Sequence, residues 1–224
     1  MPTYYHRIAG SSLERLAALS DGIFAVAMTL LVLDLRVPVA GTLHRQHPVW
    51  AGGAWQSERV LWHVLGELAP RLLTYFMSFL TLGIFWVGQQ AQLSNFARSD
   101  RHLTWIHLLF LLAVSLMPFS TSLLAEFITY RLALAVYWLN LLLLGAVLFT
   151  SLRYAKRSGL MKPATTAEMA EMLSASERRI VVYQALYAFG FLLCAINTYV
   201  SIAFIVLLQL NSAIAPRIRL LDRF

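Results

Sequence analysis

The sequence has few charged residues and a single cysteine, Cys194. Only 13% of its 224 residues are Asp, Glu, Lys or Arg, whereas a soluble domain carries about 25%. This shortage excludes an ordinary soluble protein. One cysteine cannot form a disulfide within the chain, and because Cys194 lies in an apolar run, we expect it to be a small core residue.

Motifs for catalysis and metal binding are also absent. The sequence has no H-E-x-x-H, no G-x-S-x-G and no pair of intramembrane carboxylates, so we do not expect an enzyme. His44 and His47 lie in a proline-flanked loop without a nearby cysteine or carboxylate, so we expect no metal site. The net charge is +7, but the cations are scattered between apolar runs, which argues against a nucleic-acid partner.

Long apolar runs dominate what is present, with 59% hydrophobic residues and a mean hydropathy of +0.66. A membrane helix needs about 20 apolar residues. The last uncharged run, Ile180–Pro216, would make a helix of roughly 55 Å, so we expect two spans joined near Asn197-Thr198. A single all-α membrane domain over residues 1–224 is predicted, with six spans at about 13–35, 72–93, 103–125, 132–152, 180–196 and 198–215.

The distribution of Lys and Arg supports six spans. With the N-terminus inside, 13 of these residues fall in inside segments and five in outside segments. If the last run were one span, the split would be ten to eight. The positive-inside rule therefore favours six spans with both termini cytoplasmic. We expect the protein to reside in the plasma membrane. In the long outside connection we expect Glu58–Ala69 to form a short helix at the membrane interface.

The first predicted helix is unusual because it carries Asp21 inside an apolar stretch, RLAALSDGIFAVAMTLLVLDLRVP. A charge at the centre of a membrane helix costs about 3 kcal/mol, so such a residue faces protein or water and has a partner. Arg15 points in a different direction, which favours a partner on a neighbouring helix or subunit. Alternatively, Ser20-Asp21-Gly22 is an N-cap, but the remaining Gly22–Leu33 would span only about 18 Å.

Another face of this helix carries Val26, Leu30 and Leu33 at i, i+4 and i+7 spacing, with Thr29 at its edge. Such a stripe is usual for packing within a subunit. If it faced symmetry copies of itself, it would instead form stacked apolar rings, which can gate a pore by dewetting. Thr29 would then be the hydroxyl at the constriction.

The segment Arg15-x-x-x-Leu19-Ser20-Asp21 resembles the R-x-x-x-F-S-D signature of the endolysosomal potassium channel family (transmembrane protein 175) and its bacterial relatives. The similarity continues through Gly22–Leu33. In the third span, Trp105–Phe110 and Pro118–Thr121 are similar to the W-x-N-L-L-F and P-F-x-T segments of that family.

This resemblance implies a homotetramer of six-helix subunits in the lipid bilayer, with the first helix of each lining a passive, potassium-selective pore. It implies a narrow apolar constriction at Val26, with further pore-facing side chains at Leu30 and Leu33, and a role for Thr29 in potassium preference. Permeating K⁺ is the expected partner, with no cofactor. The sequence has no T-V-G-Y-G segment, so we do not expect selectivity from a cage of backbone carbonyls as in the usual potassium channels.

The resemblance also implies a structural network formed by Arg15, Ser20 and Asp21, to which we assign His107. The chain departs from the family pattern at Leu19, where Phe is usual, and at Val26, where Ile or Leu is usual. Further departures are His107 in place of Asn, and Gln89-Gln90 after Trp86 in place of His.

Two other functions remain open from the residues alone. A proton-coupled or proton-permeable transporter would use Asp21, although carriers usually show paired broken helices or an internal repeat, and neither is evident here. A non-transporting membrane scaffold is the second alternative.

Overall fold

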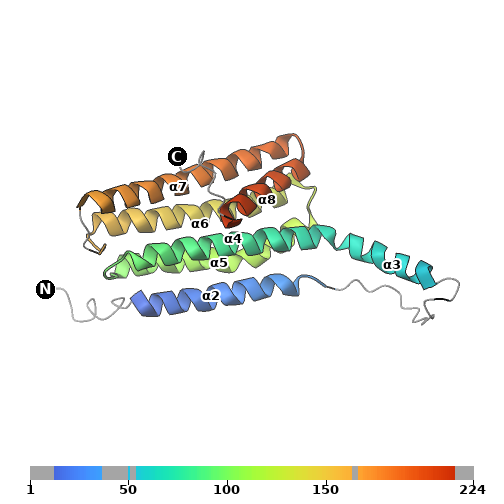
Figure 1. Ribbon diagram of the computed structural model, residues 1–224, viewed down its shortest axis with the longest axis horizontal. Coiled ribbons are helices and arrows are strands. Elements are labelled where there is room, and N and C mark those ends of the chain that lie inside the picture. Colours follow the sequence, from blue (N-terminus) through green and yellow to red (C-terminus); the bar gives the residue numbers. More distant parts are fainter. Residues whose placement is uncertain (1–12, 37–49, 51–53, 163–165, 215–224) are drawn as a thin grey trace.

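The computed structural model describes residues 13–36, 50, 54–162 and 166–214, and these form a bundle of α-helices (Figure 1). In chain order the helices are α2 Leu13–Leu33, α3 Ala54–Glu67, α4 Ala69–Ser94, α5 Arg101–Glu126, α6 Arg131–Arg157, α7 Thr166–Leu192 and α8 Thr198–Ile214. A short 3₁₀ turn, η1 Leu193–Ala195, separates the last two.

Five segments are long and apolar enough to cross a bilayer: α2, α4, α5, α6 and Ser174–Ala195 of α7 and η1. The sixth apolar helix, α8, has 17 residues, fewer than the about 20 of a typical span. The predicted break near Asn197-Thr198 is confirmed. Asn197 Oδ1 accepts a hydrogen bond of 2.7 Å from the Tyr199 backbone N–H at the start of α8, as an N-terminal cap does.

The helices lie roughly side by side along the long axis, with α2 on one side of the bundle and α7 on the other (Figure 1). The first helix, α2, packs against α4 and α5, whereas α7 packs against α6 and α8. One apolar core joins these layers and includes Phe24 of α2, Phe110 of α5 and Tyr137 of α6. Helices α4 and α5 therefore lie at the centre of the bundle.

Polar side chains tie the central helices together within the apolar core. The Tyr137 hydroxyl of α6 lies 3.0 Å from Thr81 Oγ1 of α4, and Gln209 Nε2 of α8 donates to the same Thr81 oxygen at 2.7 Å. Thr121 Oγ1 of α5 donates to Ser78 Oγ of α4 at 2.6 Å. Such interhelical hydrogen bonds stabilise helix packing where no water competes.

The short helix predicted at Glu58–Ala69 is observed as α3, Ala54–Glu67, which projects beyond the bundle (Figure 1). It carries exposed Trp55 and Trp62, the side chains that membrane interfaces favour. A His63–Glu67 contact of 3.5 Å lies on another side of this helix.

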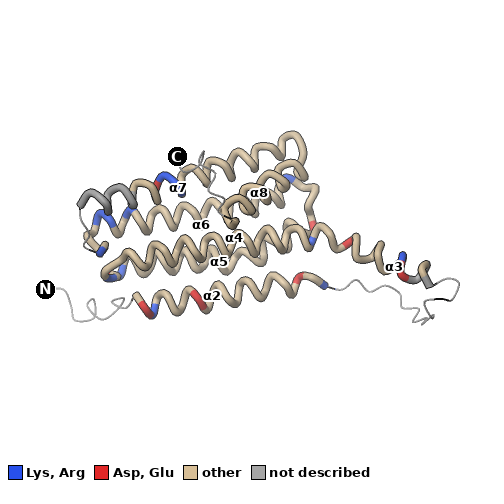
Figure 2. Tube along the Cα trace, viewed as in Figure 1, with Lys and Arg blue, Asp and Glu red and all other residues tan. Residues whose placement is uncertain are grey.

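Basic residues gather at the end of the bundle where α2 begins, around the start of α5 and the end of α6 (Figure 2). Asp100 caps α5 by accepting from Leu103 N at 2.8 Å. At the end of α6, Gly159 turns the chain with φ +64°, a conformation that favours glycine. This basic end corresponds to the predicted inside.

Candidate pore-lining helix

One face of α2 packs inside its own subunit. Its buried residues follow helical spacing and contact α4 and α5; they are Leu16, Ser20, Phe24, Ala27 and Leu31. Phe24 lies against Phe110 of α5, with ring centroids 6.0 Å apart. This stripe, rather than the one containing Val26, is the packing face of the helix.

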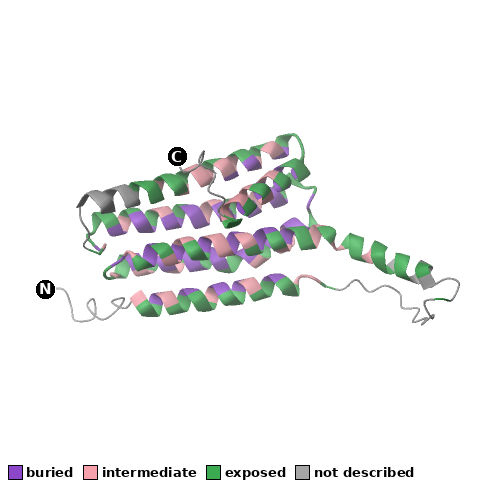
Figure 3. Ribbon diagram, in the orientation of Figure 1, coloured by how far each residue is buried: buried purple, intermediate pink, exposed green. Residues whose placement is uncertain are grey.

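The opposite face of α2 is exposed in the single subunit (Figure 3). Val26, Leu30 and Leu33 are 57%, 44% and 70% exposed, and Thr29 is exposed beside them. The interpretation of this stripe as packing within the subunit is therefore wrong. Lipid, another protein chain or a water-filled space therefore lies against it.

Thr29 is oriented by a hydrogen bond to its own helix. Its hydroxyl donates to the Val26 carbonyl at 2.8 Å. Because the proton is used in this bond, the lone pairs of the hydroxyl oxygen remain available as acceptors. The arrangement can present an oxygen to a cation or to its hydration water at the level of the stripe.

The exposed stripe continues into an apolar groove between α2 and α5, with a volume of about 600 Å³. Leu19, Gly22 and Val26 of α2 line it together with Leu108 and Leu112 of α5. The uncovered surface is therefore wider than one row of side chains.

Asp21 has its partners on α4. Trp86 Nε1 donates to Asp21 Oδ1 at 2.8 Å, and Gln90 Nε2 donates to the same oxygen at 2.6 Å. The expected partner on a neighbouring helix is confirmed, although both donors are neutral. The N-cap alternative is wrong, because α2 begins at Leu13, two turns before Asp21.

Ser20 forms a parallel contact on the buried side of the same turn. Gln89 Nε2 donates to Ser20 Oγ at 2.7 Å, and both side chains are completely buried. The two glutamines that depart from the family pattern thus supply the donors for Ser20 and Asp21. The clue in the sequence was this pair of amides in an otherwise apolar run.

The other two predicted network residues lie elsewhere on the helices. Arg15 is exposed at the N-terminal end of α2, on the same face of the helix as Leu19 and Val26. His107 is buried in α5, where Nδ1 lies 3.1 Å from the Leu103 carbonyl and the ring meets the edge of Phe96. Its part in the Ser20–Asp21 network stays a prediction.

The residues from Arg15 to Pro118, which span α2 to most of α5, match the model of the family described as endosomal/lysosomal potassium channel TMEM175. A potassium channel of Chamaesiphon minutus is 32% identical over 184 residues, which cover 80% of this chain and 79% of the relative. The chain belongs to the TMEM175 family. It is a multi-pass membrane protein, and its family comprises ion channels rather than enzymes.

Other TMEM175 relatives are similar over shorter stretches. A potassium channel of Streptomyces collinus is 40% identical over 127 residues, which cover 55% of this chain and about half, 54%, of the relative. The chicken protein named endosomal/lysosomal proton channel TMEM175 is 30% identical over 52% of this chain and 22% of its own length.

The fold agrees with that of a solved TMEM175 structure. The lysosomal potassium-selective channel TMEM175 homolog from Chamaesiphon minutus superposes with a TM-score of 0.71 and 28% identity, covering 91% of this chain and 97% of the other. The similarity therefore includes α6 to α8, beyond the family-model match.

Proposed function

We propose that this protein is a potassium-selective channel that conducts passively through a pore lined by α2. The observation that carries the proposal is the exposed apolar stripe of α2, with Val26 57% and Leu33 70% exposed. Because the opposite face of the same helix is fixed against α4 and α5, the stripe has a defined direction. The family model matches from Arg15 onward, which includes this stripe, and the relatives similar over 55% and 80% of this chain are named potassium channels.

The proposed pore requires several copies of the chain. One helix per subunit cannot enclose a water-filled path, and closed cyclic symmetry is the usual solution for identical subunits. We propose a homotetramer in which each subunit is a single domain of six spans. The apolar 17-residue α8 is then the sixth span, both termini are cytoplasmic, and the channel resides in the plasma membrane.

In this assembly Val26, Leu30 and Leu33 form three stacked apolar rings, with Val26 at the narrowest point. An apolar constriction excludes water and so sets a barrier to ions. Thr29 Oγ1, held by its bond to the Val26 carbonyl, provides an acceptor beside this constriction. Potassium preference then depends on ring size and on water held at Thr29 rather than on a cage of backbone carbonyls.

Asp21 and Ser20 serve as positioning residues in this proposal. Their three hydrogen bonds to α4 fix the rotation of α2 about its axis, which keeps the stripe directed toward the symmetry axis. Arg15 and His107 are proposed to support the same network. K⁺ is the permeating ion, and the mechanism needs no cofactor.

Proton permeation is a second candidate because vertebrate relatives are named proton channels. Asp21 is the carboxylate that a transporter mechanism would use. Against this role, its Oδ1 atom already accepts from Trp86 and Gln90, as expected for a structural carboxylate.

Liposome flux separates these functions. Purified protein is reconstituted into potassium-loaded liposomes diluted into a potassium-free buffer, and acidification of the lumen is followed with a pH-sensitive dye. A potassium channel gives acidification only when a protonophore is added, because K⁺ efflux creates the potential that drives proton entry. Acidification without protonophore supports proton permeation alongside potassium. Where neither condition gives acidification, valinomycin is added without protonophore to supply the potassium conductance. Acidification then supports a proton-permeable protein, and its absence supports a scaffold.

A further inference from the structure

A cavity of about 640 Å³ lies between α4, α6 and α7. It exists because α8 is short: α4 and α7 have 26 and 27 residues, whereas α8 has 17. Figure 1 shows α8 ending partway along the bundle, near α4. Its last turn, at Ser212 and Ala213, borders the cavity. Beyond that point no helix of the described chain fills the space between α4 and α7.

The cavity is predominantly apolar and large enough for a ligand. Its walls include Phe79 and Ile84 of α4, Leu148 of α6, and Ile180 and Tyr187 of α7. Ligand sites in proteins have volumes of about 300–1,000 Å³, with mostly hydrophobic walls and a few polar groups. A hydrocarbon chain fits these walls.

One end of the cavity is cationic. Arg179 of α7 lines it, and the guanidinium lies 5.8 Å from the centroid of the Tyr183 ring. Stacking on a ring face leaves the edge of the guanidinium directed outward, where it can donate to a phosphate. The three ion pairs among the described residues do not include Arg179; the nearby Glu177 pairs with Lys156 at 3.7 Å.

A buried amide, Gln92 of α4, also lines this cavity. Gln92 is only 6% exposed, and its Nε2 donates to the Leu148 carbonyl at 3.2 Å. Its Oε1 atom has no hydrogen-bond partner among the described residues. This oxygen is itself buried, so it does not face the cavity, and the charged contact that the cavity offers an occupant is Arg179.

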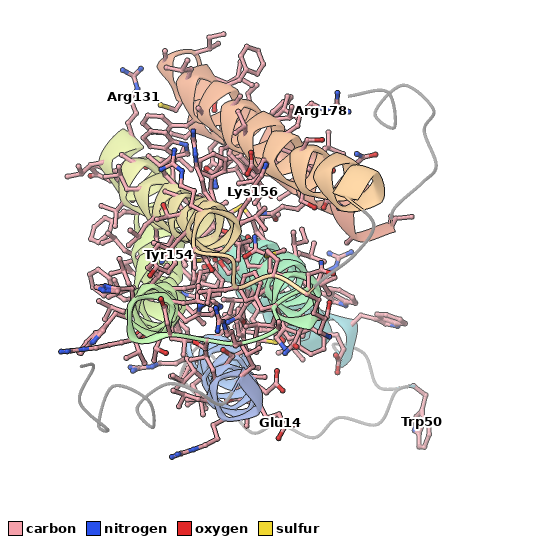
Figure 4. All side chains as sticks on the ribbon, turned by 90° about the vertical axis from the view of Figure 1, so that its left-hand side faces the viewer. Glu14, Trp50, Arg131, Tyr154, Lys156 and Arg178 are labelled. Atoms are coloured by element: carbon pink, nitrogen blue, oxygen red, sulfur yellow. The ribbon has the colours of Figure 1, made fainter. Side chains whose placement is uncertain are left out.

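The cavity is placed to receive a lipid from the membrane. Helix α2 packs against α4 and α5, whereas α7 packs against α6 and α8. In the view along the bundle, α7 with Arg178 lies at the opposite side from α2 with Glu14 (Figure 4). If α2 lines the pore, as proposed above, α7 lies at the lipid-facing periphery. That orientation rests on the proposed function, but the binding itself does not.

We propose that this cavity binds an anionic glycerophospholipid. One acyl chain occupies the apolar space, and the phosphate contacts Arg179. Phosphatidylglycerol carries the net negative charge that this arrangement favours, whereas phosphatidylcholine of the same chain length is zwitterionic. Basic pockets between membrane helices are known sites for acidic headgroups.

Native mass spectrometry of the purified full-length protein tests the proposal, with phosphatidylglycerol and phosphatidylcholine of matched chains as probes. We expect the wild type to bind phosphatidylglycerol in preference. Arg179→Gln should weaken that binding by about fivefold, the effect of one cation near an anionic lipid. Arg178→Gln is the matched control, because Arg178 is the adjacent exposed arginine and does not line the cavity.

A second variant tests the acyl-chain position. Gly83 lines the cavity, and a Cβ added there meets no atom within 4 Å. Gly83→Leu should therefore fill the space without a clash and reduce the binding of both lipids, whereas Gly66→Leu in α3, equally open, should not.

Equal effects of the two arginine variants, or unchanged binding in Gly83→Leu, would overturn the proposal. A change of oligomeric state in Gly83→Leu with lipid binding unchanged would assign the cavity to a second copy of the chain instead. Liposome flux measured in parallel reports on the proposed function separately.

Discussion

Trp86 of α4 and Asp21 of α2 are joined by a hydrogen bond of 2.8 Å from the indole Nε1 to the carboxylate Oδ1. The residues are 65 positions apart in the sequence. Gln90, one turn along α4 from Trp86, donates to the same oxygen. The pair explains how an apolar helix tolerates a carboxylate: α4 supplies two donors, and the stripe of α2 is held in a fixed direction.

Replacing Trp86 by Phe should lower the stability of the protein. Phe keeps an aromatic ring but lacks the pyrrole part of the indole and so loses one of the two donors to Asp21, which costs about 1 kcal/mol at this partly exposed site. We expect the melting temperature in detergent to fall by about 2–4 °C. Trp105→Phe is the control, since Trp105 is 62% exposed on α5. An equal fall in both variants would show that the indole contributes by size rather than by its hydrogen bond.

Tyr137→Phe should also destabilise the bundle. The hydroxyl lies 3.0 Å from Thr81 Oγ1 in a fully buried site between α4 and α6, and an interhelical hydrogen bond in a membrane protein contributes about 1 kcal/mol. A fall in melting temperature of about 2–4 °C is expected. Tyr130→Phe serves for comparison, because Tyr130 is 63% exposed. If Tyr137→Phe has the same melting temperature as the wild type, the hydrogen bond between Tyr137 and Thr81 does not stabilise the packing of these helices.

Helix positions were largely predictable from the sequence because they depend on uncharged runs. The predicted spans at 72–93 and 132–152 lie inside α4 and α6, which extend to Ala69–Ser94 and Arg131–Arg157. The extra residues include charged ones, such as Arg71 and Lys156, whose long side chains allow a helix to continue past the apolar region. A rule based on charge-free runs therefore makes these two helices too short.

The contacts between helices were not predictable in the same way. The sequence indicated that Asp21 needs a partner on a neighbouring helix but could not select Trp86 and Gln90, because their proximity depends on how α4 packs on α2. Likewise, both stripes of α2 are apolar, and only the packing distinguishes the one buried against Phe110 from the one that contains Val26. The cavity beside Arg179 arises from the relative lengths of α7 and α8, which no single run of residues determines.

Val26→Asn tests the constriction. A ring of amides would hold water at the narrowest point and lower the barrier to ions, so we expect basal potassium flux to rise on the order of tenfold, equivalent to about 1.4 kcal/mol. Leu139→Asn is the matched control, since Leu139 is 53% exposed in the middle of α6 and lies outside the proposed pore. Flux from Val26→Asn liposomes equal to that of the wild type, with normal protein incorporation, would place the constriction elsewhere.

Thr29→Val and Thr29→Ser together test the proposed role of the hydroxyl in selectivity. Valine has nearly the shape of threonine but cannot accept from hydration water, whereas serine keeps the oxygen that now bonds to the Val26 carbonyl. Loss of one hydrogen bond is worth about 1 kcal/mol, so Thr29→Val should reduce the preference for potassium over sodium by about fivefold, and Thr29→Ser should retain most of it. The measurement is the reversal potential of reconstituted channels with potassium on one side and sodium on the other. Because both variants keep a small side chain beside Val26, a change in Thr29→Val alone assigns selectivity to the oxygen. An unchanged reversal potential in Thr29→Val would instead leave selectivity to the diameter of the apolar rings.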